Sequence, residues 1–332
     1  WGLIGVGIRA YDHMDGVGNR YGVHTVILEV DGEEVFRSVV DRFAYEENRY
    51  INSWTHGQYM KSFIEPGNRL RMLHASNGNR GLVEINEERP YRFVYTLSDA
   101  LGNTSKVRFT VQGKNTEIHP VEHREKYAFK WDRTNYLQEP GLELVVPRGM
   151  LYDDVWLDYS VRADSGDVAF TYQLHNKRVP LHGACEMRIG LRRDRLEDKS
   201  KYYVAGVTAR GGKYSIGGTY EDGFMKVRIR DLGTYTVAVD TVPPEIIPLN
   251  PGQWGRTGRI TLKAKDKETG INSYRGTIDG KYALFGKPNS ISGNLVCELD
   301  PKHVKKGGRH TVEMTVTDGR GNRTTEEFHF VW

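Results

Sequence analysis

The chain has 332 residues, and its 47 basic and 43 acidic side chains give a formal net charge of +4 with the two signs interspersed. Nucleic-acid-binding domains gather basic residues on one face, so this pattern argues against such a partner. No apolar run approaches the roughly 18 residues of a membrane-spanning helix. The 37 Gly and 12 Pro residues, with few helix-length stretches, predict an all-β chain of two or three domains.

Residues 1–113 predict a first antiparallel sandwich. Alternating apolar residues flank Asp31-Gly32, and Asp-Gly between such runs is a strong signal for a tight hairpin turn. Similar runs flank Asp99-Ala100-Leu101-Gly102-Asn103. In this second sequence the carboxylate of Asp99 can accept backbone N–H groups, while Gly102 and Asn103 tolerate positive φ. Both sequences therefore predict turns that join neighbouring strands.

The stretch 114–240 predicts a second β-sandwich with an unrelated sequence. Alternating apolar residues such as Leu142, Leu144 and Val146 indicate strands, and glycine pairs at 211–212 and 217–218 indicate hairpin turns. Clustered prolines in 241–251 then predict a stiff connector that holds the next module at a fairly fixed angle.

Residues 252–332 repeat the pattern of the first module. Asp279-Gly280 matches the first hairpin signal, and Asp318-Gly319-Arg320-Gly321-Asn322 matches the second. An earlier strand ends at an acidic residue in each copy, Asp12 and Asp266. We therefore expect three consecutive β-sandwich domains, of which the first and third are immunoglobulin-like repeats.

The first copy carries an insertion. Asp31 and Asp99 are 68 positions apart (99 − 31), whereas Asp279 and Asp318 are 39 apart (318 − 279), so the first copy is longer by 29 residues. The extra residues lie near 43–79 and combine aromatic and basic side chains, which could stack on sugar rings or contact an acidic glycan. The favoured alternative is a structural cap that buries its own aromatic residues. The candidate binding residues are Tyr50, Trp54, His56, Tyr59, Lys61, Arg69 and Arg71.

Catalytic patterns in the chain lack the context they need. His119-Pro120-Val121-Glu122-His123 spells a zinc-binding pattern, but that pattern requires a helix with both His side chains on one face. Here it follows Gly113 in a charged interdomain stretch and contains a proline. No G-x-S-x-G sequence is present, and Cys185 has no His at a diagnostic spacing. We expect no catalytic residue, no metal ligand and no cofactor in these residues.

Two further groups of residues raise the questions of a calcium site and of a disulfide. Asp12, Asp15 and Asn19 offer oxygen ligands for calcium in a Gly-rich loop, although a solvated hairpin loop is the favoured interpretation. Cys185 and Cys297 are 112 residues apart (297 − 185) in different predicted domains. We expect two free thiols rather than a disulfide, and this cysteine count does not decide the cellular compartment.

The start of the chain resembles a known family. The resemblance rests on residues 1–12 (WGLIGVGIRAYD), on Tyr21-Gly22-Val23 and Val30-Asp31-Gly32, and on Arg49-Tyr50-Ile51-Asn52 and Pro66-Gly67-Asn68. These resemble the region behind the catalytic domain of Gram-negative lysostaphin-type (LytM-like) zinc peptidoglycan endopeptidases. The match covers the first module and, beyond it, only the architecture. The family's zinc motifs, including its His-x-His pair, are absent from this sequence, so no catalytic residue is carried over.

The resemblance implies an exported protein of the bacterial periplasm or outer-membrane surface, with a lipoprotein or secretory signal. These residues would be its noncatalytic accessory region, which positions a peptidase domain or docks on an envelope partner. Because the sequence opens at Trp1 without an initiating Met, we expect that an upstream region of the protein is missing from it. The alternative is a free-standing envelope or surface adhesin that uses the insertion to hold peptidoglycan, another glycan or a protein.

Overall fold

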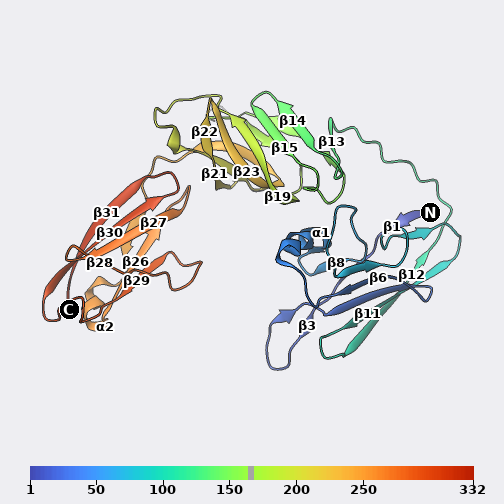
Figure 1. The fold of residues 1–332 in the computed structure, drawn as a ribbon, viewed down its shortest axis with the longest axis horizontal. Helices are drawn as coiled ribbons and strands as arrows, with labels where there is room; N and C mark the ends of the chain where they lie inside the picture. Colours follow the sequence, from blue (N-terminus) through green and yellow to red (C-terminus); the bar gives the residue numbers. More distant parts are fainter. Residues whose placement is uncertain (164–167) are drawn as a thin grey trace.

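The chain forms an all-β structure of sandwich modules, as the sequence predicts. The computed structural model describes residues 1–163 and 168–332. Figure 1 shows three modules that follow one another around a bend, with the middle module between the other two. Each module has its own hydrophobic core, drawn from residues 8–97, 129–237 and 246–330 respectively. The exact domain boundaries at 113, 240 and 251 stay predictions.

The first module packs a five-stranded sheet against smaller sheets. The large sheet has the order β12-β11-β5-β6-β9. Its strands are β5 Thr25–Val30, β6 Glu33–Val39, β9 Leu73–Ala75, β11 Pro90–Ser98 and β12 Thr104–Gln112. The small sheets are β2-β8-β7, β1-β10 and β3-β4. Their strands are β1 Gly2–Ile4, β2 Gly7–Arg9, β3 Asp12–His13, β4 Arg20–Tyr21, β7 Thr55–His56, β8 Tyr59–Lys61 and β10 Val83–Ile85.

The middle module packs two five-stranded sheets face to face. One has the order β14-β15-β19-β23-β22 and the other the order β17-β18-β24-β20-β21. The first comprises β14 Asn135–Glu139, β15 Leu142–Val146, β19 Val179–Gly190, β22 Thr219–Glu221 and β23 Phe224–Leu232. The second comprises β17 Ser160–Arg162, β18 Thr171–Gln173, β20 Tyr202–Val207, β21 Lys213–Gly217 and β24 Thr234–Val239. A short pair, β13 Tyr127–Phe129 and β16 Val155–Leu157, completes the module.

The third module has a four-stranded and a three-stranded sheet. The four-stranded order β28-β27-β30-β31 matches β6-β5-β11-β12 of the first module strand for strand. Its strands are β27 Ile271–Ile278, β28 Lys281–Ala283, β30 Arg309–Asp318 and β31 Arg323–Val331. The other sheet, β25-β26-β29, comprises β25 Glu245–Pro248, β26 Arg259–Lys265 and β29 Asn294–Glu298. Part of the predicted connector is therefore a strand, because Ile246 reaches the core while β25 pairs with β26.

The two Asp-Gly turns have the same geometry. Asp31 and Asp279 adopt left-handed φ values of 53° and 51°, and each is followed by a glycine with positive φ. The Asp31 N–H donates to Arg92 O, and the Arg92 N–H donates back to the Asp31 carboxylate. Asp279 makes the same exchange with Thr311. The backbone N–H of Arg92, followed by the side chain of Arg89, lowers the pKa of Asp31 and keeps its carboxylate charged.

In the two Asp-x-x-Gly-Asn turns the first Asp side chain accepts the same hydrogen bonds. In each copy the first Asp accepts from the backbone N–H two and four residues later and from the Asn side chain. The copies differ in surroundings, because Asp99 and Asn103 lie on the surface whereas Asp318 and Asn322 are buried. The Asn322 side chain also donates to the backbone carbonyl of Asp240, at the end of the middle module.

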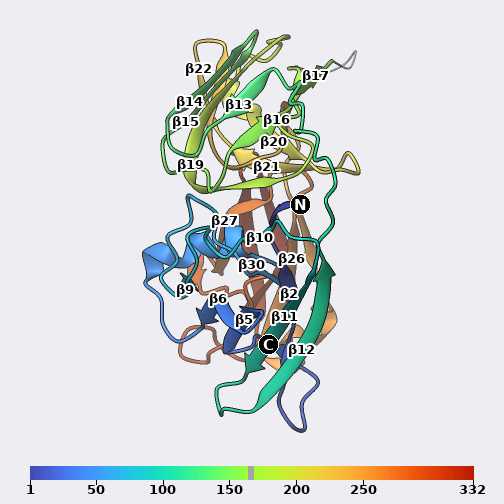
Figure 2. The same cartoon turned by 90° about the vertical axis from the view of Figure 1, so that its right-hand side faces the viewer.

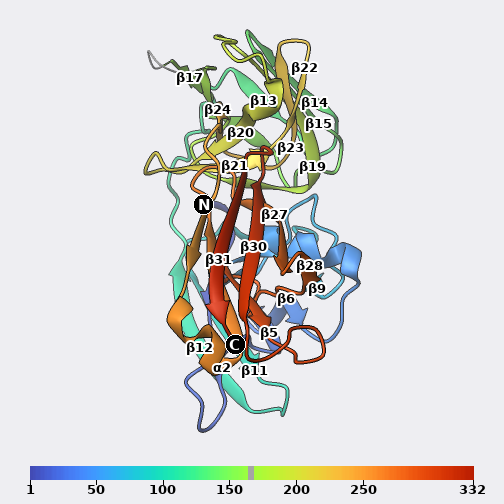
Figure 3. The same cartoon turned by 90° about the vertical axis from the view of Figure 1, so that its left-hand side faces the viewer.

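Further contacts hold the third module against the middle one. The Arg320 guanidinium donates to Tyr202 O and Gly218 O, and Thr269 donates to the Asp240 carboxylate. The Tyr203 hydroxyl donates to Glu268 at 2.7 Å. Figure 3 shows β30 and β31 reaching up to the middle module next to β21. The turn of the third module is thus also its docking surface.

The insertion of the first module contacts the middle module. It contains the short helical turns η1 Tyr45–Tyr50 and α1 Ile51–Trp54, followed by β7 and β8. Arg49 donates to Leu181 O and His182 O at 2.8 and 2.6 Å, and the rings of Tyr50 and His182 stack at 4.1 Å. The Tyr152 hydroxyl donates to Arg49 O. In Figure 2 the middle module lies directly above the first, on the side of this insertion.

Replacing Asn322 by Ala should destabilise the chain more than replacing Asn103. Both substitutions remove the same intraturn hydrogen bonds, but Asn322→Ala also leaves buried acceptors on Asp240 and Asp318 without a donor. We expect losses of about 2 kcal/mol and below about 1 kcal/mol respectively. Urea unfolding curves for the two variants measure the difference. Equal losses would mean that the Asp240 contact contributes nothing to stability.

Both cysteines are buried in separate cores and unpaired. Burial raises the pKa of each thiol to about 11, so the reactive thiolate is scarce at neutral pH. A disulfide-exchange reagent at pH 8 should modify neither thiol in the native chain and both in denaturant. Modification of either Cys185 or Cys297 without denaturant would show that its module opens readily.

Candidate functional site

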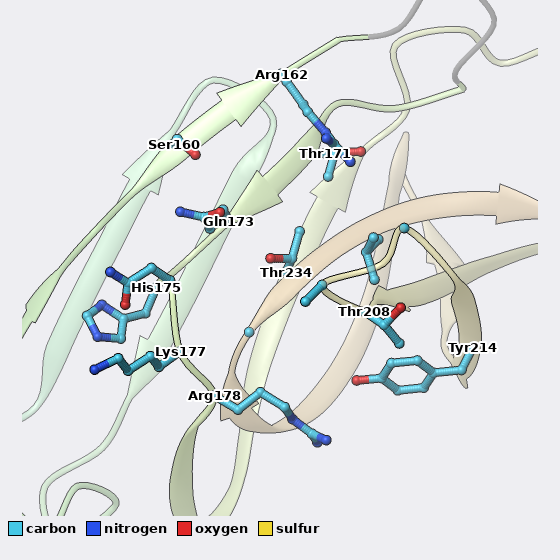
Figure 4. A pocket seen from close by; sticks show the side chains of 15 residues that line it. Ser160, Arg162, Thr171, Gln173, His175, Lys177, Arg178, Thr208, Tyr214 and Thr234 are labelled. Atoms are coloured by element: carbon cyan, nitrogen blue, oxygen red, sulfur yellow. The ribbon is translucent and has the colours of Figure 1, made fainter.

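A polar pocket of 670 Å³ lies on the middle module. Figure 4 shows its wall and floor, built from β17, β18 and β24 on one side and from the β20–β21 hairpin on the other. The lining residues are Ser160, Arg162, Thr171, Gln173, His175, Asn176, Lys177, Arg178, Val207, Thr208, Ala209, Gly211, Tyr214, Gly233 and Thr234.

Side chains alternate between the two faces of a strand, and this alternation determines which residues form the polar floor of the pocket. Ser160 pairs with Gln173, and Gln173 pairs with Thr234 in the next strand, so the three side chains share one face of the sheet. The residues between them, such as Tyr172 and Tyr235, point the other way and are buried in the core. The outer face at this end of the sheet is consequently hydroxyl and amide rich.

Basic residues surround this floor. Arg178 is engaged, since its guanidinium donates to Asp231 at 2.5 Å, and this contact raises the pKa of Arg178. His175 accepts the Asp158 N–H at Nδ1, while burial, with a smaller contribution from Lys177, lowers its pKa. Arg162 and Lys177 have no carboxylate partner within the described part of the chain. Among the residues that the structure describes, the pocket therefore presents two positive charges without a carboxylate partner, beside neutral donors and acceptors.

This chemistry suits the binding of a polar ligand. Hydroxyls and amides can exchange hydrogen bonds with the hydroxyls of a sugar, and Tyr214, 39% exposed, offers a ring at the mouth. An anionic group would pair with Lys177 or Arg162. The pocket contains neither a cysteine nor a pair of carboxylates, and the Nδ1 of its one histidine is occupied by a backbone N–H.

The insertion residues singled out from the sequence do not form one open surface. Trp54 is 5% exposed and donates from its indole to Lys61 O, and Tyr50 packs on His182. Lys61 pairs with Glu65, and Arg71 pairs with Glu47. Tyr59, His56 and Arg69 are exposed. A role of these residues in binding stays a prediction, and the structure supplies a different role for the insertion, the contact with the middle module.

The other candidate site residues singled out from the sequence lie outside the pocket of the middle module. His119, Glu122 and His123 lie in a segment without helix or strand, and the His123 ring stacks on Trp156 at 3.7 Å. Asp12 joins the β3–β4 hairpin and accepts the N–H of His13, while Asp15 and Asn19 lie exposed in its loop. The turn residues Asp31, Asp99, Asp279 and Asp318 occupy the turns described above.

One group of carboxylates in the described part of the chain is close enough to hold a metal ion. The ligand atoms of Asp240, Asp266 and Asp318 lie within 4.8 Å of one another at the junction of the last two modules. Carboxylates of this kind suit calcium. Each also accepts hydrogen bonds from the protein, for example Asp266 from the N–H groups of Glu268, Thr269 and Gly270. These hydrogen bonds account for the position of the carboxylates.

Sequence reasoning missed the pocket of the middle module. Its residues are single polar positions spread from 160 to 234, and no motif links them. The only local signals are the basic pair Lys177-Arg178 and the glycine turn at 211–212, which are typical of any solvated hairpin. Only the pairing of β17, β18 and β24 brings them together.

One family model matches the middle module. Residues 126–240 match the model of the Zu5-like domain. No curated protein matches the chain. The described residues contain no helix that is long and apolar enough to cross a membrane.

Several solved all-β structures align with the chain at low similarity. The glucan-utilisation protein SGBP-B of Bacteroides ovatus, solved with a mixed-linkage heptasaccharide, has 11% identity and a TM-score of 0.17, with 98% of this chain and 63% of that chain covered. A Ca²⁺-stabilised ice-binding adhesin of an Antarctic bacterium has 11% identity and a TM-score of 0.18, with 99% and 93% covered. A 1.5-MDa bacterial ice-binding adhesin has 9% identity and a TM-score of 0.16, with 94% and 87% covered. At TM-scores this low the alignments give no information about function, and none of these three proteins is described as a peptidase.

The burial of Trp54 predicts that the insertion is structural. Trp54→Ala should cost about 3–5 kcal/mol, because it removes a large buried side chain and leaves a cavity. Tyr45→Ala is the matched control in the same insertion, since Tyr45 is 93% exposed and should be close to neutral. Thermal unfolding of both variants checks this, and a Trp54→Ala variant as stable as the control would contradict it.

Proposed function

We propose that the chain is the noncatalytic binding region of an exported bacterial envelope or surface protein, and that the pocket of the middle module binds an acidic oligosaccharide. The observation that carries this proposal is the pair of cations Arg162 and Lys177, which have no carboxylate partner in residues 1–163 and 168–332, beside the hydroxyl and amide floor. A neutral sugar would use the floor alone. A ligand with a carboxylate or sulfate would also neutralise the two cations, which gains charge-assisted hydrogen bonds.

Titration of the full chain with acidic and neutral oligosaccharides tests the proposal. We expect the acidic ligands to bind more tightly and their affinity to fall with added salt, because exposed charges are screened. Lys177→Glu should weaken binding about 10- to 100-fold, the equivalent of one lost charge-assisted hydrogen bond. Lys287→Glu makes the same charge change on an exposed loop of the third module and is the control. Equal binding by both variants would refute the assignment of the pocket.

A second proposal follows from the sequence resemblance and from the contacts between modules. The chain would then be the accessory arm of a zinc-peptidase-related envelope protein and would position a catalytic domain or dock it on a partner. The hydrogen bonds of Arg49 and of Asn322 support an arm whose modules keep a defined arrangement. The gene sequence ahead of Trp1 decides this proposal: a His-rich peptidase domain supports it, and its absence favours a free-standing adhesin.

A further inference from the structure

The first module has an open strand edge where the third module has a covered one. The sequences Val6-x-Ile8-x-Ala10-x-Asp12 and Ile260-x-Leu262-x-Ala264-x-Asp266 have the same pattern, so β2 corresponds to β26. In the third module β26 pairs with β29 on one side and with β25 on the other. In the first module β2 pairs with β8 on one side, and among the described residues no strand pairs with its other edge.

The backbone polar groups on this edge point away from β8. The N–H of Ser62 donates to Val6 O, which identifies Val6 as a residue that bonds to the β8 side. In an antiparallel ladder alternate residues bond to opposite sides, so the N–H and C=O of Gly7 and Arg9 face the open edge. Their counterparts in the third module are Thr261 and Lys263, and Thr261 O accepts the N–H of Leu249 just beyond β25.

The neighbouring strand β12 exposes apolar side chains on its inner face. Val107 and Phe109 are 46% and 37% exposed, although they pair with the buried Tyr95 and Phe93 of β11. Inner faces of sandwiches are normally covered. Figure 2 shows β12 along the margin of the module. A stripe of exposed apolar side chains on the inner face of a sheet, such as Val107 and Phe109 here, marks a surface that a further element can cover.

The third module shows which element covers the counterpart of Phe109. Phe328 of β31 corresponds to Phe109, and the Trp254 ring meets Phe328 edge to face at 6.2 Å. Trp254 follows β25 and donates to Leu249 O. Thr324 of β31 donates to Pro244 O, at the start of the same segment. One arm, residues 244–254, therefore completes the sheet beside β26 and covers β31.

A groove marks the corresponding place in the first module. It has a volume of 380 Å³ and is lined by Arg9 of β2, by Ala10 just after this strand, and by Thr104 and Ser105 at the start of β12. Ser105 corresponds to Thr324, which binds the arm in the third module. The groove therefore lies between the two strands that the arm of the third module bridges.

We propose that the edge of β2 and the stripe of β12 form an acceptor groove for one extended peptide arm of the type of residues 244–254. The arm adds antiparallel to β2 and places an apolar side chain opposite Ala10, as Ile246 lies opposite Ala264. An aromatic residue after the strand covers Phe109, as Trp254 covers Phe328. Backbone hydrogen bonds to Gly7 and Arg9 supply affinity, and the two apolar positions supply specificity. This acceptor groove is separate from the pocket of the middle module.

A fusion protein tests the proposal. A copy of residues 244–254 is placed directly before Trp1. This fusion reproduces the spacing of the third module, because Trp254 precedes Ile260 by six residues and the added Trp precedes Val6 by six. We expect hydrogen exchange at Gly7 and Arg9 to slow at least about tenfold, as for newly protected strand amides. The unfolding temperature of the first module should rise by roughly 5 °C.

Two controls keep the test specific. The same arm with Ser at the positions of Ile246 and Trp254 has the same length and should give neither effect. On the acceptor side, Phe109→Ser changes an exposed residue and should leave the unfused chain folded while it reduces the gain from the arm. Unchanged exchange at Gly7 and Arg9 in the fusion, or equal gains from the arm and its Ser-substituted control, would overturn the proposal.

Discussion

The carboxylate of Asp318 is almost fully buried, and a buried charge must be hydrogen bonded to be tolerated. The turn around it meets this requirement with two backbone N–H groups and the side chain of Asn322. Because Asn322 has a second amide hydrogen, the same side chain also binds Asp240 in the preceding module. One local requirement for satisfied hydrogen bonds thus fixes both the hairpin and its attachment. The direction of the third module relative to the middle one depends on this turn.

The repeated module is used in two ways within one chain. In the third module the end that carries the Asp-x-x-Gly-Asn turn is buried against its neighbour, and the turn residues are part of an interface. In the first module the same end is exposed, and contact with the middle module comes instead from the insertion, through Arg49 and Tyr50. The two copies therefore differ less in fold than in which surface they bury. The polar pocket on the module between them is open to solvent.

The sequence predicted the elements that depend on local chemistry. Asp-Gly and Asp-x-x-Gly-Asn specify turns through positive φ and side-chain hydrogen bonds between near neighbours, so both copies could be found without a structure. It did not predict that Ile246 belongs to a strand, because the prolines around it suggested a connector. For the insertion the sequence left two interpretations open and favoured a cap with buried aromatic residues, and Trp54 is indeed buried. The pocket of the middle module depends on the lateral pairing of strands distant in sequence, for which Ser160, Gln173 and Thr234 carry no individual signal.

The path of β25 has a mechanical consequence. The chain leaves the middle module at Asp240, passes Pro243 and Pro244, and runs along β26, while Trp332 ends the module at the opposite end of β31. Tension between the modules would pull β25 along its own axis. The hydrogen bonds of an antiparallel pair lie across the strands, so such a load is shared by all of them at once rather than broken one by one. In this geometry the third module would resist such a load in shear.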